Sequence, residues 1–208
     1  PLILATTFLW FDYSHLATQD LIYSSLVTIG IFSIVKTNSK KELVYIFLFG
    51  IWIGLAFMMK TFLIAIPITS LVPYLIKKKY IFTSKYFWIG LIIGFAPFIL
   101  WTISINTYLD KNIVFHLLDK FNNLSKENIF TNPFYYYLWN IPVNFLPWSI
   151  FSIVGVINGL RSKNPQHFIL CYFPLILIIL LSSFSTKTPY YPLQISSILS
   201  LNAFLGIK

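Results

Sequence analysis

The sequence predicts an all-α protein, a polytopic transmembrane helix bundle with about seven membrane segments and one longer outer-face loop. Composition gives the first observation, because 57% of the 208 residues are hydrophobic and only 10% are charged. Globular domains carry about a quarter charged residues. The second observation is the order along the chain, in which long apolar runs alternate with short polar stretches.

The apolar runs set the expected crossings. Residues 1–11 have the character of the end of a membrane helix, and the expected spans after them are 21–35, 43–59, 61–76, 86–105, 134–157, 167–184 and 190–207. The longest polar stretch is 106–133, which becomes the expected outer loop. Prolines at 97, 142 and 147 lie inside spans and are expected to kink them.

Lys60 stands in the middle of the longest apolar run, from Leu43 to Ile76. That run is too long for one crossing, since about 20 apolar residues span a bilayer. A lysine at the bilayer centre is costly. We therefore expect two segments that meet at Lys60, which then marks a helix end at a membrane surface or a water-filled cavity.

The charges divide between two sides when the spans alternate. One side receives ten of the 15 basic residues and a single acid, Glu42. The positive-inside rule makes that side cytoplasmic. Its basic residues are Lys36, Lys40, Lys41, Lys77, Lys78, Lys79, Lys85, Arg161, Lys163 and Lys208. The outer face then holds the polar residues of interest, which are Asp12, His15, Asp20, Lys60, His116, Asp119 and Lys187.

This distribution of charge also argues against nucleic acid as a partner. The net charge is +9, but the basic residues lie between apolar segments and do not form one continuous basic face. No glycine-rich phosphate loop occurs in the sequence. The single cysteine, Cys171, lies in an apolar run and is expected to be a buried, inert thiol.

Two kinds of role remain open for the outer-face charges. Asp20 stands at the start of an apolar helix, where it is expected to cap the helix or to act as a base or cation ligand, and the two roles are compatible. Lys60 and Lys187 either snorkel to the interface or recognise an anionic group such as a phosphate. Tyr190 and Tyr191 flank Lys187 and either belong to an aromatic membrane belt or line a binding site.

His116 and Asp119 share one face if residues 113–121 form a helix. Their spacing suits a metal ion or a proton relay, although two ligands are few for a metal site. An amphipathic helix lying at the membrane interface is the alternative. The sequence therefore leaves a divalent cation open as a cofactor.

Several stretches, in order, resemble one family of membrane enzymes. They are Ala17-Thr-Gln-Asp20, Gly54-Leu-Ala-Phe-Met-Met-Lys60, Phe115-His-Leu-Leu-Asp-Lys-Phe121, Asn132-Pro-Phe-Tyr-Tyr-Tyr-Leu with Leu146-Pro-Trp-Ser149, and Ser185-Thr-Lys-Thr-Pro-Tyr-Tyr-Pro-Leu193. The set is similar to the GT-C fold glycosyltransferases of the protein O-mannosyltransferase and lipid A aminoarabinose transferase type, which are glycosyltransferase family 39-like. One departure is Thr61-Phe62, where that family usually has Gly-Pro.

The resemblance implies a hexosyl or pentosyl transferase that moves a sugar from a polyprenyl-phosphate donor to a lipid, glycan or protein acceptor on the extracytoplasmic face. It implies a bacterial inner membrane protein in which Asp20 supports catalysis and in which Lys60, His116, Lys187, Tyr190 and Tyr191 bind substrate. We expect residues 1–208 to be part of a single transmembrane domain, with its N-terminal helix, its first outer loop and its main base before Pro1. A multi-pass transporter or lipid flippase is the alternative function.

Overall fold

The computed structural model describes residues 1–16, 18–37, 39–109, 113–124, 132–162, 165–184 and 186–208, and the regular elements in these ranges are all helical. This confirms the all-α prediction. The chain begins with α1 (Leu2–Ala5), α2 (Phe8–Ser14), α3 (Gln19–Lys36), α4 (Glu42–Lys60), the 3₁₀ turn η1 (Thr61–Ile64) and α5 (Ala65–Lys77). It continues with α6 (Tyr80–Thr83), α7 (Lys85–Leu109), α8 (Ile113–Leu124), α9 (Tyr136–Asn144), α10 (Ser149–Arg161), α11 (Pro165–Ser183) and α12 (Leu193–Ile207).

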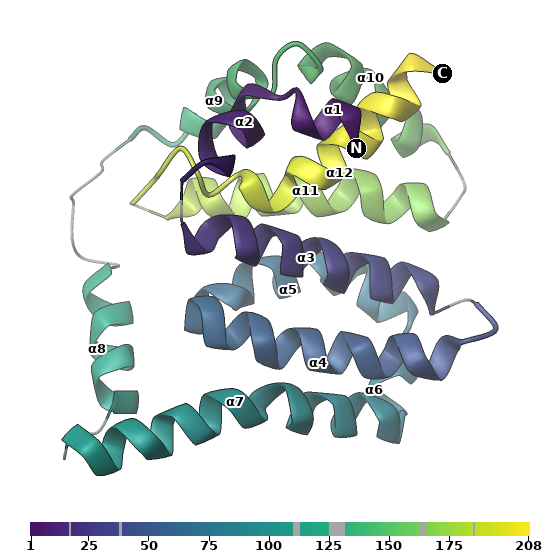
Figure 1. Cartoon of the computed structure of the whole chain (residues 1–208). Helices are drawn as coiled ribbons and strands as arrows, with labels where there is room; N and C mark the ends of the chain where they lie inside the picture. Colours follow the sequence, from purple (N-terminus) through teal and green to yellow (C-terminus); the bar gives the residue numbers. More distant parts are fainter. Residues whose placement is uncertain (17, 38, 110–112, 125–131, 163–164, 185) are drawn as a thin grey trace.

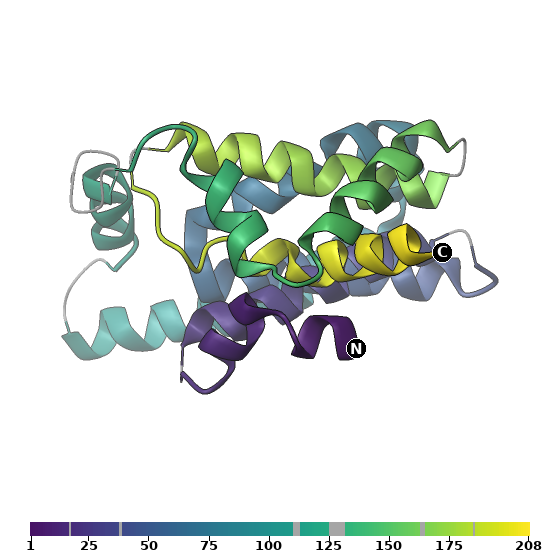
Figure 2. The ribbon, with the colours of Figure 1, turned by 90° about the horizontal axis from the view of Figure 1, so that it is seen from above.

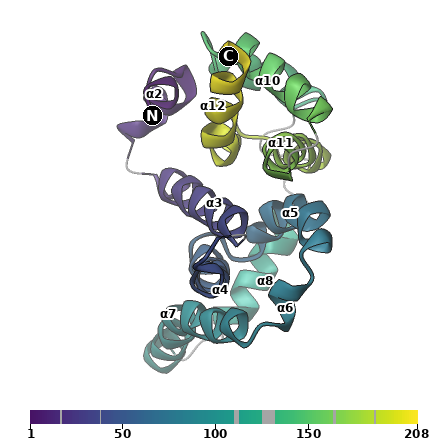
Figure 3. The ribbon, with the colours of Figure 1, turned by 90° about the vertical axis from the view of Figure 1, so that its right-hand side faces the viewer.

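The long helices lie side by side and form a bundle (Figure 1). Seen nearly along their axes, they range from α7 at one edge through α4 and α3 to α12 and α10, with α5 and α11 alongside (Figure 3). The short helices α1 and α2 lie against α12 (Figure 2). Helix α8 differs, since it stands across one end of the bundle (Figure 1).

Helices α4 and α7 make the closest pairing, and small residues explain it. Gly50 and Gly54 on α4 face Gly90 and Gly94 on α7, so each helix presents a Gly-x-x-x-Gly pattern. A Cβ atom at any of the four positions would overlap the backbone of the facing helix. Such patterns let membrane helices approach closely, which fixes the position of the Lys60 end of α4 against α7.

The helical run from Glu42 to Lys77 breaks at Thr61, as the lysine in the apolar run predicted. Thr61 has φ 48° and ψ −123°, a conformation that a β-branched residue rarely adopts. Lys60 is the last residue of α4, and α5 lies behind α4 in Figure 1. The break therefore places the Lys60 ammonium at a helix end.

Among the described residues, two helical runs are long and apolar enough to cross a membrane, Glu42–Lys77 and Lys85–Tyr108. Helices α9 and α10 together would make a third, and His167–Ser183 and Leu193–Ile207 are shorter apolar helices. The expected kink within 134–157 is present, and it divides the segment into two helices. Helices α9 and α10 meet at 115°, and the break falls next to Pro147, whereas Pro142 lies within α9.

Hydrogen bonds between α3 and α12 bring the beginnings of these two helices together. The Ser24 hydroxyl donates to the Leu193 carbonyl oxygen at 2.6 Å, and Thr28 Oγ1 lies 3.0 Å from Ser197 Oγ. Cys171 is buried on α11, with its Sγ 3.4 Å from the Val156 carbonyl oxygen, which confirms the expected buried thiol.

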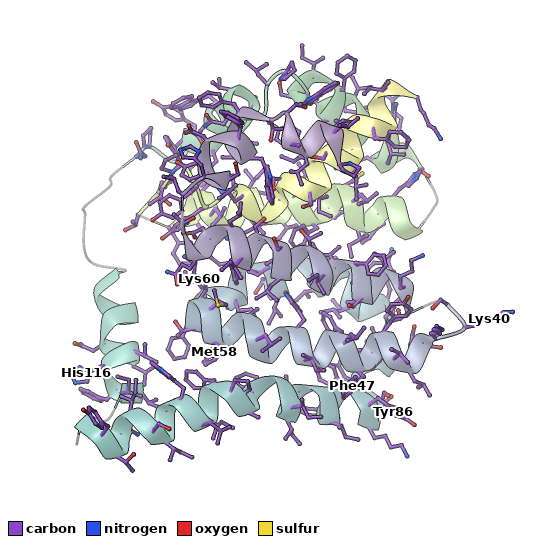
Figure 4. All side chains as sticks on the ribbon, viewed as in Figure 1. Lys40, Phe47, Met58, Lys60, Tyr86 and His116 are labelled. Carbon is purple, nitrogen blue, oxygen red and sulfur yellow. The ribbon has the colours of Figure 1, made fainter. Side chains whose placement is uncertain are left out.

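The two ends of the bundle differ in the residues they carry (Figure 4). Lys60 and His116 lie at one end, and Lys40 and Tyr86 lie at the opposite end. This agrees with the separation of Lys40 from Lys60 that the alternation of spans predicted. Lys111, Lys126 and Lys163 lie outside the described residues.

Candidate functional site

Asp20 and Lys60 form an ion pair at the end of the bundle that carries Lys60. The Lys60 Nζ lies 2.6 Å from Asp20 Oδ1, and the two side chains are only 11% and 15% exposed, respectively. Asp20 lies in the first turn of α3 and Lys60 in the last turn of α4. Each charge therefore also suits the dipole of its own helix end.

The capping alternative for Asp20 is wrong in this structure. The N-cap of α3 is Thr18, whose side chain makes no capping hydrogen bond. The Asp20 carboxylate is instead directed at Lys60, which is far away in the sequence. A pairing of this kind leaves no local sequence signal, whereas a cap can be read from its neighbours.

A cavity of about 440 Å³ opens beside the ion pair. Its wall is mixed: Lys60 and the tyrosines supply polar groups, while methionine, leucine and aromatic side chains supply apolar surface. The lining residues are Gln19, Met58, Met59, Lys60, Thr61, Leu63, Phe98, Trp101, Leu117, Tyr190 and Tyr191. This composition suits an amphiphilic ligand that has a charged group and an apolar chain.

Three tyrosine rings stack edge to face beside the cavity. Tyr13 of α2 contacts Tyr190 with ring centroids 6.0 Å apart, and Tyr190 contacts Tyr191 at 5.3 Å. Burial, followed by the neighbouring Tyr190 and Asp20, raises the pKa of the Tyr191 phenol. Tyr191 therefore stays neutral at physiological pH and keeps its proton for hydrogen bonding.

Lys187 lies in the turn that carries these tyrosines, but it does not line the cavity. Its side chain is buried, and its Nζ donates to the Phe184 carbonyl oxygen at 2.6 Å. The turn is held from α9 and the segment before it, because Tyr137 donates to the Thr188 carbonyl oxygen and Asn132 to that of Lys187. In this arrangement the Lys187 side chain connects the turn to Phe184, the residue that follows α11.

Helix α8 forms over residues 113–124, as its pattern predicted. Its Leu117 lines the cavity, whereas the neighbouring His116 and Asp119 are exposed. Within the described ranges, no three His, Cys, Asp or Glu side chains come together in a way that would hold a metal ion.

Two known groups of proteins resemble this chain. Residues 1–103, just under half of the chain, match the sequence model of the family described as dolichyl-phosphate-mannose-protein mannosyltransferase. Among solved structures, ArnT from Cupriavidus metallidurans bound to undecaprenyl phosphate matches with a TM-score of 0.81 and 15% sequence identity over 99% of this chain. The present chain therefore has the GT-C fold.

The same ArnT in the apo state matches with a TM-score of 0.72 and 14% identity over 99% of this chain. The chain spans 39% and 38% of the two ArnT chains. No curated protein sequence matches. Together, the family match and the ArnT fold confirm the family resemblance that the ordered motifs predicted.

Sequence reasoning missed part of the cavity wall. Phe98 and Trp101 line the cavity from the second half of α7, three residues apart, and neither was among the predicted site residues. Their spacing on one helical face next to an outer loop was the available signal. Gln19 was also missed, although it immediately precedes Asp20.

Proposed function

We propose that this chain forms the donor-binding part of a membrane glycosyltransferase that moves a sugar from a polyprenyl-phosphate donor to a lipid, glycan or protein acceptor. The observation that carries the proposal is the Asp20–Lys60 pair at the wall of an amphiphilic cavity. The protein would be a multi-pass protein of a bacterial inner membrane. The basic end of the bundle would face the cytoplasm and the cavity would face outward.

Charge explains why a lipid phosphate fits this cavity. Lys60 lines it with an ammonium group, and an ammonium has three N–H donors, of which one suffices for Asp20. A phosphate entering the cavity would receive a charge-assisted hydrogen bond from this lysine. Met58, Met59 and Phe98 would accommodate the apolar chain next to the phosphate.

The ArnT match supports this choice of ligand. That structure carries undecaprenyl phosphate, and its TM-score of 0.81 exceeds the 0.72 of the apo form. The family matched by residues 1–103 is described by a dolichyl-phosphate-mannose donor. Both descriptions name a polyprenyl phosphate, which is the chemistry that a lysine beside an apolar wall would recognise.

The proposed reaction breaks the bond between the sugar's anomeric carbon and the lipid phosphate oxygen. An acceptor hydroxyl attacks that carbon and gives up its proton, and the lipid phosphate leaves with the bonding electrons. Lys60 would stabilise the negative charge that develops on the leaving phosphate. Asp20 would support this step by holding the Lys60 ammonium in place.

The remaining predicted residues receive supporting roles in this proposal. Tyr190 and Tyr191 line the cavity and would contact the sugar through their rings and hydroxyl groups. Lys187 would hold the turn that carries them. His116, exposed next to the cavity-lining Leu117, would reach a substrate only at the outer edge of the site. The base that takes the acceptor proton is left unassigned.

A transporter or flippase is the second candidate, and one observation bears on it. Such a protein would expose charge along a path across the membrane, whereas the ion pair here lies at helix ends at one end of the bundle. The location of the cavity at that same end favours a reaction at one membrane face.

The test is a transfer assay on the purified full-length protein. Polyprenyl-phosphate sugars are supplied with candidate lipid, glycan and peptide acceptors, and products are identified by mass spectrometry. Formation of a glycosylated acceptor together with free polyprenyl phosphate supports the proposal. Movement of intact donor across proteoliposomes without any bond cleavage would instead support the flippase.

A further inference from the structure

A second, much smaller space lies behind the ion pair. It has a volume of about 10 Å³ and is lined by Asp20, Tyr23, Lys60, Leu63, Ile66, Leu181, Tyr191 and Gln194. Lys60, Leu63 and Tyr191 also line the large cavity, so these three side chains form the wall between the two spaces. Lys60 therefore borders both spaces, whereas Asp20 borders the small one.

Two buried polar groups border this small space without a protein partner. Among the described residues, neither Tyr23 Oη nor Gln194 Oε1 has a hydrogen-bond partner. Tyr23 is 1% exposed and Gln194 is 8% exposed. A buried hydroxyl or amide oxygen without a partner is costly, so a ligand within this space that bonded to both groups would be stabilising.

Tyr23 and Gln194 come from two helices that the fold holds together. Tyr23 follows Asp20 by three residues on α3, so the two side chains share one face of that helix. Gln194 lies next to Leu193, whose carbonyl oxygen accepts the Ser24 hydrogen bond between α3 and α12. The fold thus brings both polar groups to the rear of the Asp20–Lys60 pair.

We propose that this space binds one ordered water molecule, and that Tyr23 and Gln194 are positioning residues that orient the Asp20–Lys60 pair through it. The inference rests on the proposed function, because orientation of Lys60 matters for a phosphate in the large cavity. A space of about 10–15 Å³ holds one water and nothing larger.

A water molecule in this space can accept two hydrogen bonds and donate two. It accepts one hydrogen bond from the Tyr23 hydroxyl and one from the Lys60 ammonium, and it donates one to Gln194 Oε1 and one to the Asp20 carboxylate. Four bonds to four protein groups satisfy the water and both orphaned side chains. With the water in place, the Lys60 ammonium is held from behind, and its remaining N–H donor faces the large cavity.

The test is a double-mutant cycle on the full-length protein, with undecaprenyl phosphate as the probe. The variants are Tyr23→Phe, Gln194→Leu, Lys60→Met and each of the first two combined with Lys60→Met. We expect Tyr23→Phe and Gln194→Leu to weaken probe binding roughly 3- to 10-fold in the wild-type background, the size of one net hydrogen bond. In the Lys60→Met background they should change affinity by less than about 2-fold, because their effect acts through Lys60.

Tyr74→Phe provides the matched control. Tyr74 is another buried tyrosine whose hydroxyl has no partner among the described residues, and it lies on α5 near Lys78, away from the cavity. It should leave probe affinity unchanged. Equal losses from Tyr23→Phe with and without Lys60 would overturn the positioning role, since a general loss of folding acts in both backgrounds.

Direct observation of the water separates this inference from the proposed function. A map of the full-length protein that shows ordered water should have one within hydrogen-bond distance of Tyr23 Oη and Gln194 Oε1, whether or not the probe binds. An empty space, or a Tyr23 hydroxyl bonded directly to Asp20, would overturn the inference. Failure of the wild-type protein to bind the probe while the water is present would overturn the proposed function alone.

Discussion

The ammonium of Lys60, at the end of α4, lies 2.6 Å from the carboxylate of Asp20, at the start of α3. This pairing joins two helix ends and places one positive charge at the wall of a 440 Å³ cavity. Because both side chains are mostly buried, removing either partner would leave the other charge without its counter-charge in a poorly solvated place.

Replacing Lys60 by methionine should weaken binding of a polyprenyl phosphate roughly 10- to 100-fold, which corresponds to the loss of one hydrogen bond to a charged group. Binding to the full-length protein is measured with undecaprenyl phosphate in detergent. Lys40→Met is the control, since Lys40 lies at the opposite end of the bundle (Figure 4). Equal affinities of the two variants would count against a phosphate role for Lys60.

Exchanging the two charges, with Asp20→Lys and Lys60→Asp in one protein, should keep most of the thermal stability, because an ion pair can form again. Binding of the lipid phosphate should still fall at least about 10-fold, since a carboxylate now lines the cavity and repels the anion. Melting temperature and affinity are measured on the same preparation. Full affinity in the exchanged protein would mean that the pair serves the fold alone.

Lys187→Ala should abolish transfer while the protein is still produced, because the turn bearing Tyr190 and Tyr191 loses its attachment to the Phe184 carbonyl oxygen. Lys187→Arg should retain part of the activity, since its guanidinium can donate to the same carbonyl. Turnover by the alanine variant close to that of the wild type would show that the turn does not need this contact.

Gly54→Leu should destabilise the bundle by at least about 1–3 kcal/mol, the usual effect of overpacking. The added side chain would meet the backbone of α7 at Gly94. Ile92→Ala, on the exposed face of α7, serves as the control and should have little effect. Unfolding in detergent gives the comparison, and an unchanged Gly54→Leu protein would contradict the close α4–α7 approach.

Lys78, at the end of the bundle opposite Lys60, should make the stability of the protein depend on pH. Burial lowers the pKa of its ammonium below the ordinary 10.5, so the unfolded chain holds this proton more tightly than the folded protein. Stability should therefore rise with pH between the folded pKa and 10.5. Lys78→Met removes this titration, and its melting temperature should rise less over the same range. Parallel profiles for the two proteins would show that Lys78 makes no such contribution.

Local patterns in the sequence were sufficient to predict some features of the fold and of the site. A lysine inside a 34-residue apolar run, from Leu43 to Ile76, had to mark a break, and the break lies at Thr61. The helix considered for residues 113–121 is present as part of α8. Motif order predicted the family resemblance, which the family match over residues 1–103 and the ArnT-like fold together support.

Contacts between distant segments could not be predicted in this way. Nothing near Asp20 indicates Lys60, so a helix cap was the local alternative, and it was wrong. The prolines indicated a kink over 134–157, but the sequence did not show that the break would fall at Pro147, since Pro142 lies inside α9 without ending it. Gln194 Oε1, which has no hydrogen-bond partner among the described residues, has no sequence signal, because its neighbours come from distant segments such as α3 and α11.

The most direct test of the central claim is a structure of the full-length protein bound to a polyprenyl phosphate. We predict that the phosphate lies in the cavity lined by Met58, Lys60, Trp101 and Tyr191, within hydrogen-bond distance of Lys60 Nζ. A phosphate bound elsewhere, with Lys60 still paired only to Asp20, would contradict the account.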